Sequence, residues 1–172
     1  ALQDAAQAGG PDTVQSATPA AGATTASADI RDAQGASVGT ARFEEGETGV
    51  RISLQLTGLP EGAHGFHIHQ VGECTAPGFE SAGSHFNPTS RQHGLENPEG
   101  PHAGDMENLE VSAGGSVQLA VDNDRITLGE GANSLFDADG SAIVIHAQAD
   151  DNVSDPSGNA GDRIACGVIT RD

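Results

Sequence analysis

Residues 50–57 alternate apolar and polar side chains without a break, and this pattern restricts the fold more than any other stretch of the sequence. Its apolar members are Val50, Ile52, Leu54 and Leu56. Successive side chains of a β-strand point to opposite faces of a sheet, so the pattern predicts a strand with one buried face. Residues 116–122 repeat the alternation and predict a second strand of the same kind.

The other apolar stretches are also short, and a chain with 24 glycines and neither Trp nor Tyr favours strands and turns over helices. Strands are predicted at 27–34, 37–45, 50–57, around His67 and His69, and at 106–112, 116–122, 142–147 and 164–170. We therefore expect an all-β fold, an eight-stranded antiparallel Greek-key β-barrel or sandwich of the immunoglobulin-like kind. Residues 71–103 and 148–162 are predicted to be two long loops, and such loops in a compact domain are usually functional.

Residues 1–26 have a different composition from the rest of the chain. They consist mainly of Ala, Gly, Thr, Ser, Gln and Pro, with scarcely any large apolar side chain. Such a segment cannot offset its ordering entropy by burial, which predicts a flexible, low-complexity leader. Residues 27–172 are then expected to form one domain, because that length can bury a core of its own.

The charge of the chain excludes several classes of partner. The net charge is −18, with 25 acidic residues against seven arginines and no lysine. Binding to nucleic acid or to an anionic membrane surface requires basic patches, so neither is expected. No apolar run approaches the roughly 18 residues of a transmembrane helix, so no membrane-spanning segment is expected.

The chain has two cysteines, Cys74 and Cys166, which form neither a CxxC redox motif nor a four-thiolate zinc site. One structural disulfide is the favoured interpretation and implies an oxidising compartment, while two buried free thiols are the alternative. The first residues lack the basic start and apolar segment of a signal peptide. For an exported protein the sequence thus predicts the processed form, in a secreted, periplasmic or cell-envelope location.

The histidines are the candidate functional residues. The segment Phe66-His67-Ile68-His69 reads as a short strand, which would place both imidazoles on one face and both apolar side chains on the other, toward the core. Isolated histidines are usually surface or hydrogen-bonded core residues. A chain with seven histidines, several of them ordered in this way, argues instead for bound metal.

The spacing of the histidines predicts two metal sites. The first long loop and the residues that follow it supply His85, His93, His102 and Asp105. Three imidazoles and one carboxylate complete a tetrahedral zinc site of the structural type. The strands supply His67, His69 and His146, which with one more imidazole would give the four-nitrogen, roughly planar site that Cu(II) prefers. Either the two sites share a ligand or the copper site is three-coordinate.

Four segments together resemble the copper,zinc superoxide dismutase family. They are Gly65-Phe66-His67-Ile68-His69, Gly83-Ser84-His85-Phe86-Asn87-Pro88, Gly100-Pro101-His102-Ala103-Gly104-Asp105, and the run from Gly158 to Ile169. The likeness extends from about residue 27 to the C-terminus, with the segments in the family's order. Cys74, five residues after His69, is more similar to the bacterial secreted branch than to the eukaryotic cytosolic one.

The resemblance implies two ligand sets that share one imidazolate. The copper ligands would be His67, His69, His85 and His146. The zinc ligands would be His85, His93, His102 and Asp105. Asp150 would be the outer carboxylate that links His67 to His93, and Arg163 would lie beside the copper as the docking charge for the substrate anion. His85 and Arg163 would be the catalytic residues, Cys74 and Cys166 would form the disulfide that anchors the metal loop, and His64 would be a structural hydrogen-bonding residue.

The resemblance also implies an activity. The chain would convert superoxide to oxygen and hydrogen peroxide, as an antioxidant enzyme, by ping-pong redox cycling of a copper ion bridged through His85 to a structural zinc. A homodimer is left open. The alternative is a non-catalytic copper- and zinc-binding domain of the same fold, and the completeness of the ligand sets together with Arg163 favours the enzyme.

Overall fold

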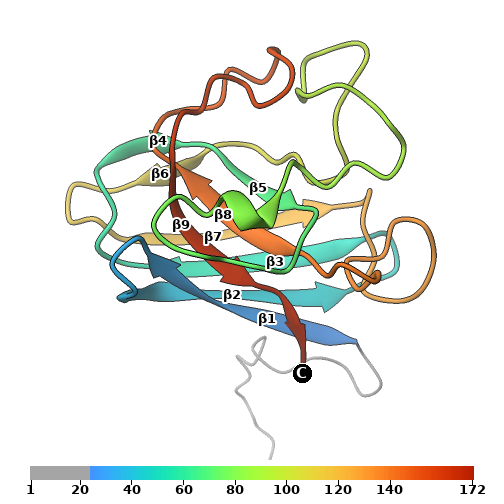
Figure 1. The fold of residues 1–172 in the computed structure, drawn as a ribbon, viewed down its shortest axis with the longest axis horizontal. Coiled ribbons are helices and arrows are strands. Elements are labelled where there is room, and N and C mark those ends of the chain that lie inside the picture. Colours follow the sequence, from blue (N-terminus) through green and yellow to red (C-terminus); the bar gives the residue numbers. More distant parts are fainter. Residues whose placement is uncertain (1–23) are drawn as a thin grey trace, which may run out of the picture.

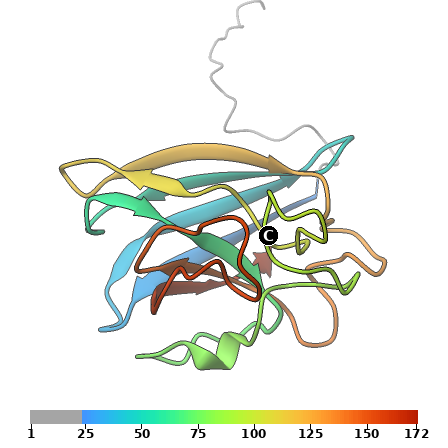
Figure 2. The same cartoon turned by 90° about the horizontal axis from the view of Figure 1, so that it is seen from above.

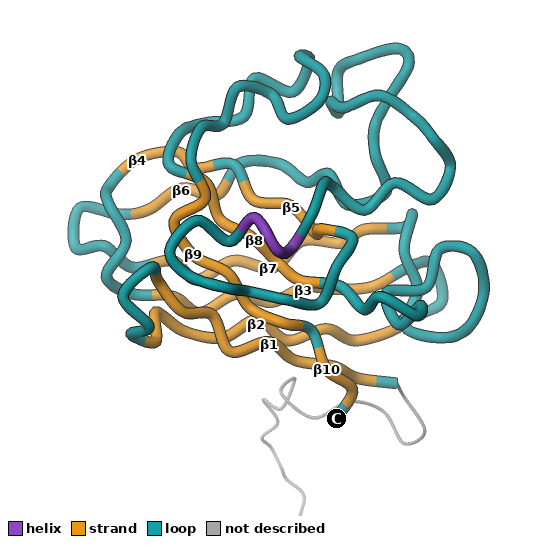
Figure 3. Tube along the Cα trace, viewed as in Figure 1, coloured by secondary structure: helices purple, strands orange, loops and turns teal. Residues whose placement is uncertain are grey.

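A computed structural model describes residues 24–172, and this part of the chain is almost entirely strand and loop (Figure 3). Its strands are β1 Thr25–Asp32, β2 Ser37–Glu45, β3 Val50–Leu56, β4 Gly62–His64, β5 Phe66–His69, β6 Leu109–Val111, β7 Val117–Asn123, β8 Ala142–His146, β9 Arg163–Val168 and β10 Thr170–Arg171. A single 3-10 turn, η2 Glu80–Ala82, interrupts the first long loop. The all-β prediction is confirmed.

The strands form one large antiparallel sheet and a small antiparallel pair. The large sheet has the order β5-β8-β9-β1-β2-β3-β7, with β10 also paired to β1, and the small pair is β4-β6. The first three strands follow one another as hairpins, after which the chain crosses to the far edge to form β5 and returns to form β7 (Figure 1). Seen from above, the sheet curls so that its two halves face each other (Figure 2). The crossings give the Greek-key connectivity that was expected.

The structure has ten strands where the sequence predicted eight, because two expected strands are divided. The segment around His67 and His69 becomes β4 and β5, which separate at Gly65 and pair with different partners, β6 and β8. The Gly65 amide donates to the Gln148 carbonyl, and a Cβ at Gly65 would press against Ala160 and Asp150. Glycine therefore lets the chain change sheets beside the second loop. The C-terminal strand similarly divides at Ile169 into β9 and β10.

The core lies between the two halves of the curled sheet. The alternation in residues 50–57 has the predicted outcome, since all the apolar side chains of β3 are buried and Arg51 and Gln55 are exposed. Phe66 and Ile68 are completely buried in the same core, on the opposite face of β5 from the histidines. β5 thus closes the hydrophobic interior with one face and presents its imidazoles with the other.

The first strand begins at Thr25, two residues before the predicted domain boundary. Ala26 pairs with Phe43 of β2 and is fully buried. The rest of the predicted leader, residues 1–23, lies outside the described residues. Within residues 24–172 no helix is long and apolar enough to cross a membrane.

The two long loops lie side by side at one end of the sheet (Figures 1 and 2). The Glu96 amide donates to the Asn152 carbonyl at 2.9 Å, and the Asn97 side chain donates to the Val153 carbonyl at 3.2 Å. Gly94 has a φ of 120° and lies so close to the Asn152 carbonyl that a side chain would not fit. These contacts join residues that are more than 50 positions apart in the sequence and hold both loops over the histidines of β5 and β8.

Candidate metal centre

The histidine cluster forms along the edge of β5. The first loop and residues 102–105 pair with this strand there. Isolated β-bridges pair His69 with His85 and His67 with Asp105. The backbone of Ile68 completes this attachment, since its amide donates to the Gly104 carbonyl at 2.9 Å and its carbonyl accepts from the Phe86 amide at 2.8 Å. A loop residue that is far away in the sequence thereby lies beside each of the two strand histidines.

Four imidazoles converge on one point inside this cluster. They belong to His67, His69, His85 and His146, and each offers a nitrogen within 4.8 Å of the other three. All four side chains are buried. The nitrogens left without a hydrogen-bond partner are Nδ1 of His67 and Nε2 of His69, His85 and His146. Buried polar atoms without a partner are costly, so four facing one another indicate a site built for a cation.

The opposite nitrogen of each strand imidazole has a partner that determines its tautomer. Nδ1 of His69 lies 2.8 Å from the Gly83 carbonyl, and Nδ1 of His146 lies 3.1 Å from the Gly161 carbonyl. A carbonyl only accepts, so both Nδ1 atoms carry protons and both Nε2 atoms keep free lone pairs. In His67 the arrangement is reversed, with Nε2 bonded to Asp150 and Nδ1 left free.

A second group of donors lies directly behind His85. Nδ1 of His85 is 3.2 Å from Nδ1 of His102 and 3.1 Å from Oδ1 of Asp105. The same Asp105 oxygen is 2.9 Å from Nδ1 of His93 and 3.4 Å from Nδ1 of His102. Donors bound about 2.0 Å from a tetrahedral zinc are roughly 3.3 Å apart. The four predicted residues therefore already have a spacing close to that of a zinc site.

His67 also approaches this second group. His67, His85, His93 and Asp105 offer four donors within 4.8 Å of one another, so His67 and His102 compete for the fourth position. The two differ in their other contacts. Both nitrogens of His67 are engaged elsewhere, one with Asp150 and one toward the first group. The polar contacts of His102 Nδ1 are with His85 and Asp105, both members of the second group.

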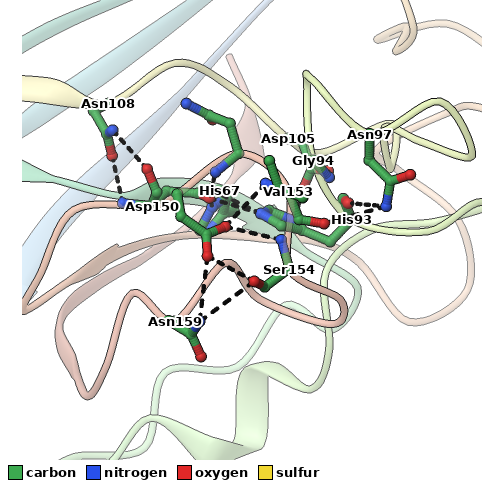
Figure 4. A network of polar contacts seen from close by, with 12 residues as sticks. His67, His93, Gly94, Asn97, Asp105, Asn108, Asp150, Val153, Ser154 and Asn159 are labelled. Carbon is green, nitrogen blue, oxygen red and sulfur yellow. Dashed lines mark hydrogen bonds and ion pairs between the residues drawn. The ribbon is translucent and has the colours of Figure 1, made fainter.

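Asp150 connects the two groups (Figure 4). Its Oδ2 lies 2.6 Å from Nε2 of His67, and both of its oxygens lie 2.9 Å from Nε2 of His93. Its backbone is fixed by Asn108, whose side chain accepts from the Asp150 amide at 2.8 Å and donates to the Asp150 carbonyl at 2.9 Å. One carboxylate therefore orients a ring in each group.

The protonation states differ between the groups. Burial lowers the pKa of His67 to about 3 and that of His146 to about 4, and it also lowers the pKa of His69 and His85. Burial acts in the same direction on His93, but its hydrogen bonds to Asp105 and Asp150 outweigh this and raise the pKa to about 9. The first group thus offers neutral nitrogens at neutral pH, as metal binding requires, whereas His93 must lose a proton.

The carboxylates of Asp105 and Asp150 are ionised. Burial alone would raise the pKa of Asp105, but hydrogen bonds from His102, His85 and His93 lower it well below its ordinary value. The bonds of Asp150 with His67 and His93 likewise outweigh burial and lower the pKa of Asp150. A negative charge is therefore available on each side of His93 to balance a bound cation.

Arg163 begins β9 and has a side chain that is neither fully buried nor exposed. Its Nη1 donates to the Phe79 carbonyl at 2.9 Å, and its charge is close enough to His69 and His146 to contribute to the lowering of their pKa values. Cys74 and Cys166 form the predicted disulfide, with an S–S distance of 2.02 Å. That bond ties the first loop, which carries Phe79, to the strand that carries Arg163.

His64 lies outside both groups. Its Nδ1 is 2.8 Å from the carbonyl of His146 and its Nε2 is 2.8 Å from the carbonyl of Pro60. The ring thus links the backbone of a cluster histidine to the turn before β4, which agrees with the structural role that was expected. It offers no nitrogen to a metal.

The family can now be read from a comparison with known proteins. Residues 37–169 match the family model described as copper/zinc superoxide dismutase (SODC). The chain belongs to the copper/zinc superoxide dismutase family. Copper and zinc are accordingly its cofactors, and it is an oxidoreductase whose family acts on superoxide.

Two curated relatives illustrate the range of this family. Superoxide dismutase [Cu-Zn] 1 of Aquifex aeolicus (strain VF5) is 50% identical over 144 residues, which cover 83% of this chain and 85% of the relative. The superoxide dismutase-like protein YojM of Bacillus subtilis (strain 168) is 45% identical over 139 residues, which cover 79% of this chain and 71% of the relative.

Solved structures agree with the fold. A SOD-like protein from Bacillus subtilis, crystallised as a double mutant in which a tyrosine and a proline are replaced by histidine, has a TM-score of 0.81 and 43% identity. The match covers 83% of this chain and 95% of that chain. The antiparallel sandwich predicted from the sequence is therefore confirmed by structural comparison as well.

Several residues that support the superoxide dismutase site were not found from the sequence. Asn108 was predicted to lie in a strand over 106–112, but the strand is shorter and Asn108 instead holds the backbone of Asp150. Asn123 and Arg125 lie behind the segment 102–105. A polar residue at or near the end of a strand is ordinary in any sequence, so no motif marked these three.

Proposed function

We propose that this chain converts superoxide to oxygen and hydrogen peroxide by a ping-pong cycle at a copper ion bridged to zinc. The proposed copper ligands are His67, His69, His85 and His146. The proposed zinc ligands are His85, His93, His102 and Asp105. The observation that carries the proposal is the set of four buried nitrogens that face one another without hydrogen-bond partners, since each has a free lone pair and the spacing suits one ion.

The choice of His102 rather than His67 for the zinc set follows from their other contacts. His67 would have to give up either its bond to Asp150 or its place among the four converging nitrogens. Nδ1 of His102 makes no other bond that binding would break. His102 completes the set at no such cost.

The proposed chemistry divides between the metals and the chain. Copper supplies a one-electron couple, while zinc supplies charge and rigidity without changing its oxidation state. His85 is the residue whose two nitrogens face both groups, Nε2 toward the first and Nδ1 toward the second. We assign it a proton at Nε2, taken up in the reducing half of the cycle and passed to the peroxide product in the oxidising half, with the second proton of hydrogen peroxide coming from water.

Arg163 is proposed to dock the anion. A guanidinium remains protonated at any working pH, and donation to the neutral Phe79 carbonyl does not remove its positive charge. Its position near His69 and His146 would hold superoxide next to the first group. The disulfide supports this role, because it fixes the loop to which Arg163 is bonded.

The proposal includes a location and a domain organisation. A disulfide persists in an oxidising compartment, which supports a secreted, periplasmic or cell-envelope enzyme. The predicted division into an enzyme domain over residues 27–172 and a leader over residues 1–26 is supported by the family match over residues 37–169, and β1 adds Thr25 and Ala26 to the domain.

A non-catalytic metal-binding domain is the second candidate, because one relative is described only as superoxide dismutase-like. Metal content and superoxide consumption, measured on the same preparation with and without cyanide, separate the two. About one equivalent each of copper and zinc per chain, together with superoxide consumption that cyanide inhibits, would support the enzyme. Bound metals without turnover would instead establish the non-catalytic domain.

The role of Arg163 has its own test. In Arg163→Ala both metals should remain bound while turnover falls at least tenfold at low substrate. Arg31→Ala, which removes an exposed arginine paired with Asp29, is the control and should be unchanged. Normal turnover in a metal-replete Arg163→Ala protein would refute the docking role.

A further inference from the structure

The end of β7 and the residues after it hold the backbone of the segment that carries two proposed zinc ligands. The Asn123 side chain donates to the Ala103 carbonyl at 2.9 Å, and Nη2 of Arg125 donates to the Asp105 carbonyl at 2.6 Å. Asn123 is fully buried, and its Oδ1 also accepts from the Arg125 amide at 2.8 Å. We call these two residues the β7 clamp.

The clamp acts on a tightly constrained piece of chain. In segment 102–105 the Asp105 amide donates to the His102 carbonyl at 3.1 Å, and Oδ2 of Asp105 accepts from the His102 amide at 2.8 Å. Gly104 lies against the Ile68 carbonyl, where a Cβ would not fit. The clamp bonds the carbonyls on either side of Gly104, so the segment is held from β5 on one side and from β7 on the other.

The guanidinium of Arg125 is committed to this contact. Its Nε is buried and has no hydrogen-bond partner. Its nearest carboxylates are Asp124, at 3.7 Å, and Asp105, whose charge acts to raise the pKa of Arg125 against the lowering by burial. Desolvating a charge is costly unless it makes good hydrogen bonds. Here the free-energy cost of desolvating the guanidinium is offset in part by its hydrogen bond to the backbone carbonyl of Asp105, a proposed zinc ligand.

We propose that Asn123 and Arg125 are positioning residues for zinc. They hold the backbone of His102 and Asp105 so that Nδ1 and Oδ1 meet His85 and His93 at the spacing of a tetrahedral site. The inference rests on the proposed zinc ligands. It goes beyond these ligands because it proposes that the β7 clamp, which supplies no metal ligand, sets the spacing of the ligand atoms.

Three of the four proposed copper ligands, His67, His69 and His146, are oriented by other groups, whereas the shared ligand His85 contacts Asp105. The ring partners of these three are the carbonyls of Gly83 and Gly161 and the carboxylate of Asp150, and none of these is bonded to the clamp. Loss of the clamp should therefore weaken zinc binding selectively. A general loss of folding would weaken both metals together.

The test uses the full chain with Arg125→Met, which removes the donors and retains an unbranched side chain of similar length. Arg42→Met is the matched control, since Arg42 is paired with Glu44 away from the metal segment. Zinc affinity is measured by competition with a chelator, and Co(II) loaded in place of zinc reports the ligand geometry through its visible absorption. Loss of an outer partner typically weakens metal affinity about 10–100-fold.

We expect Arg125→Met to weaken zinc binding by a factor in that range and to alter the Co(II) spectrum, while copper affinity changes less than about threefold. Arg125→Lys, which keeps the charge and a donor, should restore most of the zinc affinity. Asn123→Ser provides a separate test and should weaken zinc in the same way. If Arg125→Met does not fold, the Asn123→Ser result decides.

Two outcomes overturn the inference and are distinguishable from failure of the proposed function. Folded clamp variants with wild-type zinc affinity and Co(II) spectra would show that the clamp does not position the ligands, and the proposed ligand set would stand. Equal losses of copper and zinc would show a general structural role. A wild-type chain that binds no zinc would refute the ligand set itself.

Discussion

Oδ2 of Asp150 lies 2.6 Å from Nε2 of His67, with both groups buried. The same carboxylate lies 2.9 Å from Nε2 of His93, so a single side chain from the second loop orients one ring in each proposed metal set. A carboxylate suits this position, because it has lone pairs on both oxygens, carries no proton of its own and adds a negative charge between the two rings.

Asp150→Asn should therefore weaken the binding of both metals. An amide has one acceptor oxygen, and its NH2 group would face one of the rings as an unwanted donor. We expect copper and zinc affinities to fall about 10–100-fold, the usual effect of losing an outer partner. Chelator competition measures this, with Asp139→Asn, an exposed site in another loop, as the charge-matched control. Unchanged affinity for either metal would contradict the link.

Gly158 lies against the same carboxylate. Its φ is +70°, and a methyl group there would overlap the Asp150 carboxylate and Nε2 of His93. Gly158→Ala should displace Asp150 and reproduce the metal loss of Asp150→Asn, with a backbone strain of about 1 kcal/mol in addition. Gly114→Ala is the control, because the space around Gly114 is open and its φ is not in the left-handed region.

The combination of Gly158→Ala and Asp150→Asn tests whether the two act through one contact. If they do, the double variant should bind metal no more weakly than Asp150→Asn alone. Additive losses would indicate that Gly158 acts elsewhere.

The strands and the histidines could be predicted from the sequence because both depend on local pattern. Period-two alternation located β3 and β7, and two histidines separated by one apolar residue located the ligand face of β5. The motifs that carry the family resemblance gave the ligands in order. Each of these signals is contained within a few consecutive residues.

The supporting contacts could not be predicted because they join distant parts of the chain. Asn108 and Asp150 are 42 positions apart, and Arg125 and Asp105 are 20 apart. The division of β4 from β5 at Gly65 also depends on the second loop, which lies against the glycine. Only the folded sheet shows which of many ordinary polar residues and glycines meet.

Acidification should release zinc before copper. The pKa of His93 is raised to about 9, so below that pH a proton occupies the ring and apparent zinc affinity falls up to tenfold per pH unit. The pKa values of His67 and His146, lowered to about 3 and about 4, leave the copper set unprotonated until much lower pH. The order is checked by lowering the pH of the holoenzyme in the presence of a chelator and measuring how much copper and zinc remain bound at each pH. Simultaneous release would contradict it.

The metal-free protein should lose stability in acid for a related reason. His67 and His146 have lowered pKa values in the folded state, so the unfolded chain binds more protons below about pH 6.5 and the free energy of unfolding falls. The raised pKa of His93 acts in a different pH range, because its stabilisation is complete below about pH 6.5 and is lost as the pH rises from there through about 9. Below about pH 6.5 the unfolded chain therefore takes up two more protons at His67 and His146 than the folded chain, and we expect the free energy of unfolding to fall by up to about 2.7 kcal/mol per pH unit. Denaturant unfolding at several pH values measures it.

Superoxide should be attracted only weakly from a distance, so its rate of reaction should depend little on salt. All seven arginines are engaged: Arg31, Arg42 and Arg51 with carboxylates, and Arg91, Arg125, Arg163 and Arg171 with backbone carbonyls. Apart from the metals, the positive charge near the centre is that of Arg163, and Glu80 acts on it as an opposing charge. Between about 10 and about 200 mM salt, where screening strengthens severalfold, we expect a flat or slightly rising rate.

The Glu80→Gln variant tests this expectation, because its salt dependence can be compared directly with that of the unaltered chain. Removing the acid beside Arg163 should raise the rate at low salt and make the rate fall as salt is added, because an uncompensated attraction would then be screened. Glu99→Gln removes the same charge from an exposed part of the first loop and should leave the salt profile unchanged. A steep fall with salt in the unaltered chain would mean that Arg163 already attracts superoxide from a distance in spite of Glu80, and the expectation would be wrong.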